Sequence, residues 1–385
     1  MSDNPVLLLA TRKGLVLARR TSDGWTVDDT AHFAGTPVEY CSRDPRDGTL
    51  WASLDHGHWG VKLHRSKDGG ANWEEVAAPK YPEGEQFRDP WSGKVDAAVL
   101  TNIWVIGFGG TDQPGRIYLG TNPGGLFQSD DGGDTFQLVR SLWDHPSRLG
   151  EEGGKPGWYG GGRDTPGIHS IVVDPRDSTR VFVGVSCGGV FETTDDGASW
   201  VPRNKGLPAS FLPNSDPETG QDPHHVVQCA SHPDALWQQN HLGIFKSTDA
   251  GRTWADVSHE KDQGPARFGF PIAVDPDDPA RAWVVPARSD GQRNAIGGCL
   301  QVCETTDGGT TWHSRTDGLP RSGAYDLVYR HAFDLTVHGD QRWLAFGSTT
   351  GNVFVSEDGG GRWTCVSHHL PPVYGVRFAP SEGMA

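Results

Sequence analysis

The sequence lacks the features of a membrane-spanning or secreted chain. No apolar run approaches the roughly 18 residues that a membrane-spanning helix needs. The first residues, MSDNPVLLLATRKG, lack the basic start and long apolar core of a signal peptide. We therefore expect a cytoplasmic protein with no membrane partner.

Cysteine and positive charge are also scarce. The 6 Cys include no CxxC pair, which argues against a disulfide framework and against a thiolate zinc site. The chain has 34 Lys and Arg against 49 Asp and Glu, and its formal net charge is -15. Nucleic acids and anionic membranes bind clustered positive charge, so we expect neither as a partner.

Turn-forming residues and tryptophan are abundant instead. The chain contains 52 Gly, 27 Pro and 15 Trp, but only 2 Met and no long stretch of strong helix formers. Many short strands joined by Gly and Pro turns are typical of all-β proteins.

One eight-residue phrase occurs six times. Its copies are SKDGGANW from Ser66, SDDGGDTF from Ser129, TTDDGASW from Thr193, STDAGRTW from Ser247, TTDGGTTW from Thr305 and SEDGGGRW from Ser356. The pattern predicts a tight turn between strands. Its Asp accepts hydrogen bonds from the turn's own N–H groups, its Gly takes a positive φ, and its aromatic residue packs inward. We expect these turns to be structural.

Each phrase has the same place in a longer pattern of three strands, turn and fourth strand. The pattern predicts six four-stranded units, over 38–76, 103–139, 168–203, 224–257, 270–315 and 326–366. Two fragments remain: 6–28 resembles three strands that lack a first, and 373–380 resembles a first strand alone. Together they complete a seventh unit. We predict one domain, 1–385, an all-β seven-bladed β-propeller of four-stranded antiparallel blades, the last shared between the termini.

These turn phrases resemble the Asp-box, or BNR, repeat of sialidase-like, sortilin-like and xyloglucanase propellers and of photosystem II assembly-factor propellers. The resemblance covers all seven units and implies the fold, whereas function varies among these proteins. Sialidases usually have an Arg-Ile-Pro motif, three carboxylate-binding Arg and a Tyr nucleophile, and this chain has no Arg-Ile-Pro. Arg12, Arg288 and Arg293 do not stand in that motif, so no catalytic residue is transferred. Xyloglucanases pair two propellers, and this chain has one.

In such blades, the loops between units and those between second and third strands share one face, opposite the turn phrases. Histidine is concentrated in these loops. The candidate metal ligands are His56, His58, His169, His224, His225 and His241. Neutral imidazole is a common zinc ligand, and a catalytic site uses about three protein ligands and leaves one position open. We therefore expect a bound divalent metal, zinc or similar. The alternative is that these residues are hydrogen-bonded polar side chains of a wet channel.

Other polar and aromatic residues of these loops complete the predicted site. We assign catalytic roles to Glu39, Asp55, Asp164 and Tyr325. We assign substrate contacts to Arg12, Trp59, Trp104, Asn240, Arg288 and Tyr374. Asp164 lies in a Gly-rich insertion, 143–167, and the His224–His225 pair ends a second long connection, 204–225.

The sequence thus favours a metal-dependent hydrolase or lyase for a small polar or carbohydrate-derived substrate. Two alternatives stay open: a non-catalytic propeller that binds a ligand or protein, and a metal-free sialidase-like glycoside hydrolase. The sequence leaves open the oligomeric state and which of His224 and His225 faces the channel.

Overall fold

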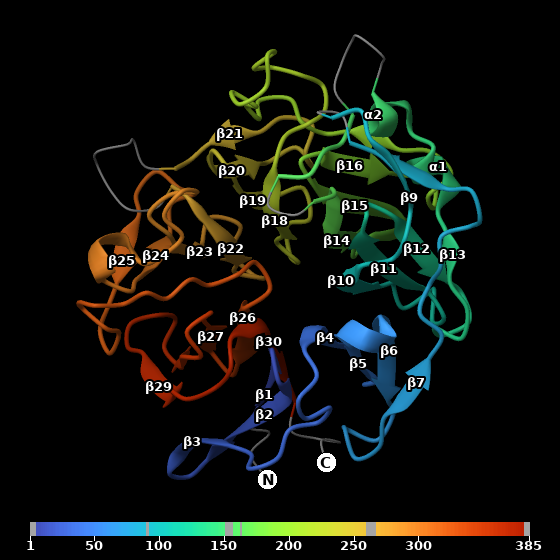
Figure 1. The fold of residues 1–385 in the computed structure, drawn as a ribbon. Helices are drawn as coiled ribbons and strands as arrows, with labels where there is room; N and C mark the ends of the chain where they lie inside the picture. The colour runs from blue at the N-terminus through green and yellow to red at the C-terminus, as the bar shows by residue number, and fades with distance from the viewer. Residues whose placement is uncertain (1–4, 90–91, 151–156, 162–163, 259–266, 381–385) are drawn as a thin grey trace. The chain divides into compact units, whose positions relative to one another are not determined.

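The computed structural model describes residues 5–89, 92–150, 157–161, 164–258 and 267–380. It is nearly all-β, and seven four-stranded antiparallel sheets form the blades of a β-propeller (Figure 1). The helical segments of the described chain are short: η1 (Gly57–Trp59), α1 (Arg140–Trp143), α2 (Pro146–Leu149) and η2 (Ile296–Gly298). Among them is no helix long and apolar enough to cross a membrane.

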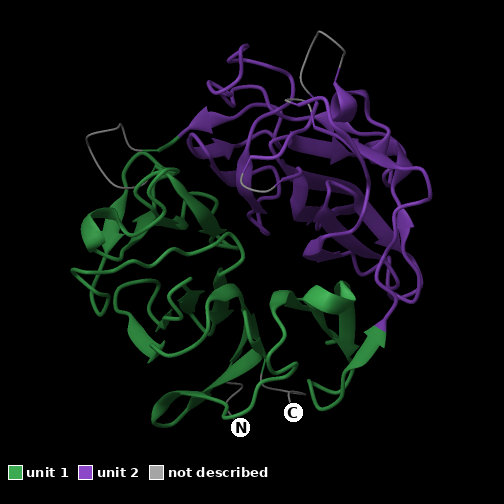
Figure 2. Cartoon of the chain, in the orientation of Figure 1, with its two compact units in different colours: residues 1–75, 257–385 green, residues 76–256 purple. Residues whose placement is uncertain are grey.

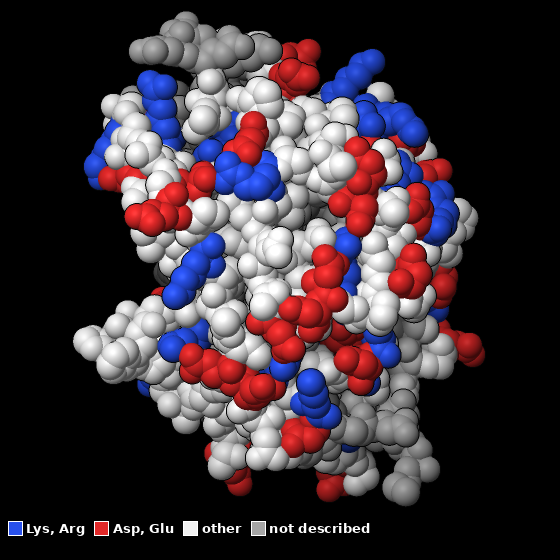
Figure 3. Space-filling model, turned by 90° about the vertical axis from the view of Figure 1, so that its right-hand side faces the viewer, with Lys and Arg blue, Asp and Glu red and all other residues white. Residues whose placement is uncertain are grey.

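The chain divides into two compact units, coloured separately in Figure 2. Unit 1 comprises residues 1–75 and 257–385, and unit 2 comprises residues 76–256. The face drawn in Figure 3 bears bands of acidic side chains with Lys and Arg interspersed, consistent with the excess of acidic residues in the sequence.

Unit 2 contains three blades and a hairpin. The first blade consists of β10 (Asn102–Phe108), β11 (Ile117–Asn122), β12 (Leu126–Ser129) and β13 (Gln137–Leu138). The second consists of β14 (Gly167–Asp174), β15 (Asp177–Ser186), β16 (Gly189–Thr193) and β17 (Val201–Pro202). The third consists of β18 (Pro223–Gln228), β19 (Leu236–Asn240), β20 (Gly243–Ser247) and β21 (Ala255–Asp256). The hairpin pairs β8 (Gln86–Arg88) with β9 (Val95–Ala97).

Four blades are assigned to unit 1. One blade consists of β4 (Val38–Arg43), β5 (Leu50–Asp55), β6 (Val61–Ser66) and β7 (Glu74–Val76), and another of β22 (Gly269–Val274), β23 (Ala282–Pro286), β24 (Val302–Thr305) and β25 (His313–Arg315). A third consists of β26 (Phe333–His338), β27 (Gln341–Gly347), β28 (Val353–Ser356) and β29 (Thr364–Ser367). The fourth has the strand order β3 (Gly24–Val27), β2 (Gly14–Thr21), β1 (Val6–Thr11), β30 (Val373–Ala379).

The shared blade confirms the prediction that the termini pair. Strand β30 runs antiparallel to β1, with Val6 opposite Ala379 and Ala10 opposite Gly375. Every residue of β1 is buried, because alternate side chains enter two different cores. Leu7 and Leu9 belong to one core, and Leu8 belongs to the other. A strand buried on both faces has the continuous apolar sequence VLLLA, without polar alternation.

The six turn phrases form the predicted hydrogen bonds. In the turn from Thr305, the Asp307 carboxylate accepts from the N–H of Thr311 at 2.9 Å, and the Thr305 hydroxyl accepts from the N–H of Gly309 at 2.9 Å. The aromatic residue that ends the phrase, Trp312, is 6 % exposed, and its indole N–H donates to the carbonyl of Val257. These turns are therefore structural devices.

A β-bulge recurs near the start of the first strand in most blades. In β18, Pro223 pairs with Asn240 and His225 with Gln239, so His224 is an extra residue in the register. The pairing skips one residue in the same way at Glu39, Trp104, His169 and Tyr374. A bulge bends the strand and redirects the side chain, and bulges are common beside functional sites. The sequence-derived list of strand-start residues thus coincides with these bulges.

Candidate functional site

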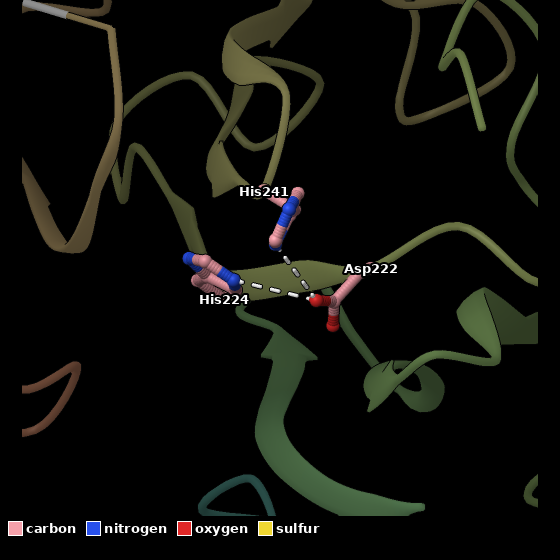
Figure 4. A group of neighbouring side chains, drawn as sticks. All are labelled: Asp222, His224 and His241. Atoms are coloured by element: carbon pink, nitrogen blue, oxygen red, sulfur yellow. Dashed lines mark ion pairs between the residues drawn. The ribbon is translucent and has the colours of Figure 1, made fainter. Parts of the chain in front are cut away.

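Three side chains of unit 2 form a compact group of metal-ligand type: Asp222, His224 and His241 (Figure 4). Their ligand atoms all lie within 4.8 Å of one another. Oδ2 of Asp222 is 3.4 Å from Nε2 of His224 and 3.5 Å from Nδ1 of His241. The two imidazole rings are 5.6 Å apart and nearly perpendicular, at 83°. Both rings thus present a nitrogen to one carboxylate oxygen.

The local backbone explains why these three residues meet. Asp222 immediately precedes β18, and His224 is the bulged residue of that strand. His241 begins the two-residue turn between β19 and β20, and its N–H donates to the carbonyl of Asp222 at 2.9 Å. The turn is closed by Asn240, whose side-chain oxygen accepts from the N–H of Leu242 at 3.0 Å. One hairpin and one bulge therefore define the cluster.

The preceding blade fixes the other oxygen of Asp222. Oδ1 accepts from the hydroxyl of Ser186 and from the N–H of Cys187, each at 3.1 Å. Burial alone raises the pKa of Asp222, but the hydrogen bonds and positive charge of His224 and His241 hold this pKa well below its usual range. The carboxylate is thus ionised, with Oδ2 facing the imidazoles.

The spacing of the cluster also fits the ligands of one metal ion. Two atoms bound about 2.1 Å from one tetrahedral zinc lie about 3.4 Å apart. The observed 3.4 and 3.5 Å agree with this geometry. Two imidazoles and one carboxylate form a donor set suited to zinc and to other first-row divalent metals.

The cluster is buried on one side and accessible on the other. The His224 side chain is 4 % exposed, whereas that of His241 is 27 % exposed. Phe211, itself 41 % exposed, packs its edge against the His241 ring at 5.7 Å. The Phe211 ring also packs against that of Tyr159 at 6.4 Å, and the Tyr159 hydroxyl donates to the carbonyl of Gly220 at 3.1 Å. A small molecule could therefore approach the cluster beside His241 and Phe211.

The remaining predicted metal ligands have other surroundings. His56 and His58 are exposed residues of unit 1, beside and within η1. His169 is fully buried; its Nδ1 is 2.9 Å from the Ser170 hydroxyl, and its ring packs edge-on against Trp104. His225 is half-buried. Within the described part of the chain, the three-membered ligand group contains none of these four.

The predicted catalytic residues are distributed over both units. Glu39, Asp55 and Tyr325 belong to unit 1 and Asp164 to unit 2. Asp55 accepts from the N–H of Gly57 at 3.0 Å, and Tyr325 is 74 % exposed. Asp164 is exposed and lines a hollow of about 450 Å³ with Phe87 and other residues.

The predicted substrate contacts differ in accessibility. Arg12, Arg288 and Trp59 are exposed, and Tyr374 is half-buried. Trp104 is 7 % exposed and Asn240 is completely buried. Asn240 holds the turn that bears His241, so the structure gives it a positioning contact.

Asp222 was absent from the sequence-based site. Its signal is the tetrapeptide DPHH, in which a carboxylate precedes two imidazoles by two and three residues. Asp-Pro also closes first strands elsewhere, as at Asp174 and Asp275, which obscured its different position before β18. The hydrogen bond that joins His241 to Asp222 depends on hairpin register, which residue spacing alone does not give.

Comparisons with known proteins indicate distant relatives. No family model matches the chain. A xyloglucanase of Hypocrea jecorina (strain QM6a) is 25 % identical over 318 residues, which cover 75 % of this chain and 34 % of that protein. The chain thus spans about a third of the length of that curated relative.

Solved structures show a likeness of fold. An ancestral GH74 enzyme superposes with a TM-score of 0.56 at 16 % identity, covering 89 % of this chain and 38 % of that one. The periplasmic gluconolactonase of Pseudomonas aeruginosa superposes with a TM-score of 0.56 at 13 % identity, covering 98 % of this chain and 99 % of that one.

Proposed function

We propose that this protein is a metal-dependent hydrolase or lyase that acts on a small polar or carbohydrate-derived substrate. Asp222, His224 and His241 would hold one divalent ion, zinc or a similar metal. The observation on which the proposal rests is the pair of distances from Oδ2 of Asp222, 3.4 and 3.5 Å, to the two ring nitrogens. Three protein ligands leave a coordination position for water or substrate, as in catalytic zinc sites.

The chain's own residues have distinct roles in this proposal. The bound metal would polarise a substrate oxygen or lower the pKa of water. Ser186 and the Cys187 N–H hold the carboxylate so that Oδ2 faces the ion, and such supporting contacts tune metal affinity. The partly exposed side of His241, beside Phe211, is where substrate would enter.

A proton acceptor completes the proposed chemistry. Of the four sequence-derived candidates, Asp164 shares unit 2 with the metal ligands and is exposed, so it is the first to test. Its replacement by Asn removes the basic carboxylate with little change of shape. Glu39, Asp55 and Tyr325 belong to unit 1 and remain candidates.

The substrate class is supported by the curated relatives. The relative from Hypocrea jecorina and one from Acetivibrio thermocellus, 27 % identical over 256 residues, are both named xyloglucanases. They are hydrolases of a carbohydrate, and we extend that class to this chain. The ligand group and its partly exposed imidazole suit a small polar molecule.

The test is hydrolysis or elimination by metal-depleted and zinc-restored protein. Neutral aryl glycosides, sugar lactones and uronic acid esters would be supplied as a panel. We expect activity on at least one class, lost on chelation, restored by zinc, and absent from His241→Ala. Chelator-resistant activity would favour the metal-free glycoside hydrolase. Ligand binding without turnover of any compound would favour the non-catalytic propeller.

A further inference from the structure

Unit 1 contains a second set of chemically distinctive residues, at the ends of three of its blades. These residues lie in segments 11–14, 267–270, 287–299, 325–332 and 370–374. The cations of these segments are Arg12, Lys13, Arg267, Arg288, Arg293 and Arg330, and the acids are Asp290 and Asp326. Six positive charges against two negative ones oppose the sign of the whole chain, which is -15.

The two acids of these segments are already engaged by neighbours. Asp290 accepts from Nε of Arg293 at 3.1 Å. Asp326 is 4 % exposed, and its Oδ1 accepts from the Ser348 and Thr350 hydroxyls at 2.7 and 2.6 Å. By contrast, Arg12, Lys13 and Arg288 are exposed and have no ion pair within 4.0 Å among the described residues. Three solvated cations are therefore available to an anion.

Aromatic rings connect these blade ends. Phe270 contacts Tyr329 at a ring distance of 6.0 Å, and Tyr329 contacts Tyr374 at 6.3 Å. Phe270 is 5 % exposed, whereas Tyr329 and Tyr374 are half-buried. The guanidinium groups of Arg293 and Arg330 lie 5.6 and 5.7 Å from the centre of the Phe270 ring. Such stacking orients a guanidinium group over an aromatic face.

Backbone hydrogen bonds show that the cations and rings share one end of their blades. The N–H of Arg12 donates to the carbonyl of Pro372, two residues before Tyr374. The N–H of Ala287, which precedes Arg288, donates to the carbonyl of Phe268, two residues before Phe270. The two cationic hairpins therefore flank the aromatic series.

We propose that this end of the three blades binds an anionic sugar, a ring that bears a carboxylate or a phosphate. Arg12, Lys13 and Arg288 contact the anionic group, and Tyr329 and Tyr374 contact the apolar face of the ring. The site shares no residue with the metal ligands of unit 2, and the proposal does not require turnover.

The experiment is calorimetric titration of the full chain in chelator, so that the metal site plays no part. The probes are glucuronate, glucose 6-phosphate, glucose and sulfate at one ionic strength. We expect at least one anionic sugar to bind about tenfold or more tightly than glucose and than sulfate. Tighter binding of glucuronate would show that a carboxylate is recognised, and tighter binding of glucose 6-phosphate would show that a phosphate is recognised.

Two variants test the assigned residues. Arg12→Gln with Arg288→Gln should weaken the anionic sugar about tenfold or more, because two charged contacts are removed. The matched control is Arg362→Gln, an exposed arginine in the turn phrase that begins at Ser356, and this substitution should leave the affinity unchanged. Equal affinity for glucose, equal affinity for sulfate, no binding of either anionic sugar, or an unaffected double variant would each overturn the proposal.

Discussion

The two ends of each blade differ in how strictly they repeat. One end carries the six turn phrases, here called the Asp turns. All six make the same hydrogen bond, in which the Asp carboxylate accepts, at 2.9 Å, from the N–H four residues ahead. At the other end the backbone repeats but the side chains do not. In four blades a backbone N–H of the hairpin between the second and third strands donates to a carbonyl of the loop before the first strand. The donor and acceptor residues are His241 and Asp222, Ala287 and Phe268, Thr349 and Leu327, and Arg12 and Pro372.

The difference teaches where chemistry can arise in this fold. The Asp turns use the side chains of their Asp and of their Ser or Thr to satisfy their own backbone, so these positions are the same in all six phrases. At the hairpin end, backbone groups satisfy one another and the side chains are free to differ. The same backbone hydrogen bond therefore joins Asp222 and His241 in the β18–β21 blade but Leu327 and Thr349 in the β26–β29 blade.

The largest expected effect comes from removing strand β30. Deleting residues 373–385 leaves β1 paired with β2 alone, so its other edge is open, and exposes the core that Val373 and Val376 share with Leu7. We expect no cooperative unfolding transition near that of the full chain, measured by circular dichroism on heating. Deleting only 381–385 leaves β30 intact and is the control. An unchanged melting temperature without β30 would contradict the shared blade.

An intermediate effect is expected at Ser186, which supports the metal ligands from the hairpin end of the preceding blade. Ser186→Ala removes one of the two donors to Oδ1 of Asp222, so zinc affinity should fall about 10- to 100-fold. Ser348→Ala removes the matching donor to Asp326, away from the ligand group, and should leave zinc affinity unchanged. Competition titration with a chromophoric chelator measures both. Equal losses would mean that the effect is a general one on folding.

The smallest effect concerns acid stability of the Asp turns. Hydrogen bonds from Asn72 hold the pKa of Asp68 at about 2, and those from Thr311 hold the pKa of Asp307 at about 2. Because the unfolded pKa is about 3.9, the stability that these carboxylates contribute is present above about pH 4 and is lost as the pH falls towards 2. Both groups are exposed, so the contribution is small.

Melting temperatures between pH 5 and pH 2 measure this contribution. Wild type should lose a few degrees more than Asp68→Asn with Asp307→Asn over this range, because the variant lacks the two titrating groups. At pH 7 the variant should melt a few degrees lower and keep its zinc affinity. Parallel curves for the two proteins would show that these carboxylates do not stabilise the fold.

Much of the fold could be predicted because each repeat is specified by residues that are close together in the sequence. Each turn phrase contains its own Asp, Gly and aromatic residue, and the unmatched fragments at the two ends required each other. The pairing of Val6 with Ala379 confirms this inference. The bulges were not predicted, because an extra residue in the register leaves no mark in the apolar pattern.

Less of the candidate site could be predicted, because it depends on register and burial. His224 and His241 were among the expected ligands, but Asp222 was missed, since its Asp-Pro resembled the strand ends elsewhere. Asn240 was expected to contact substrate, yet it is fully buried and bonds its own turn. Spacing pointed to the hairpin that bears His241 without showing which side chains lie together.

The most direct test of the account is the zinc stoichiometry and affinity of the purified chain. We predict one zinc per chain and a loss of affinity of about hundredfold or more in Asp222→Ala, His224→Ala and His241→Ala, because each removes one of three ligands. His58→Ala, at an exposed imidazole outside the cluster, should retain wild-type affinity. Absence of zinc binding, or zinc binding that survives all three ligand substitutions, would contradict the account.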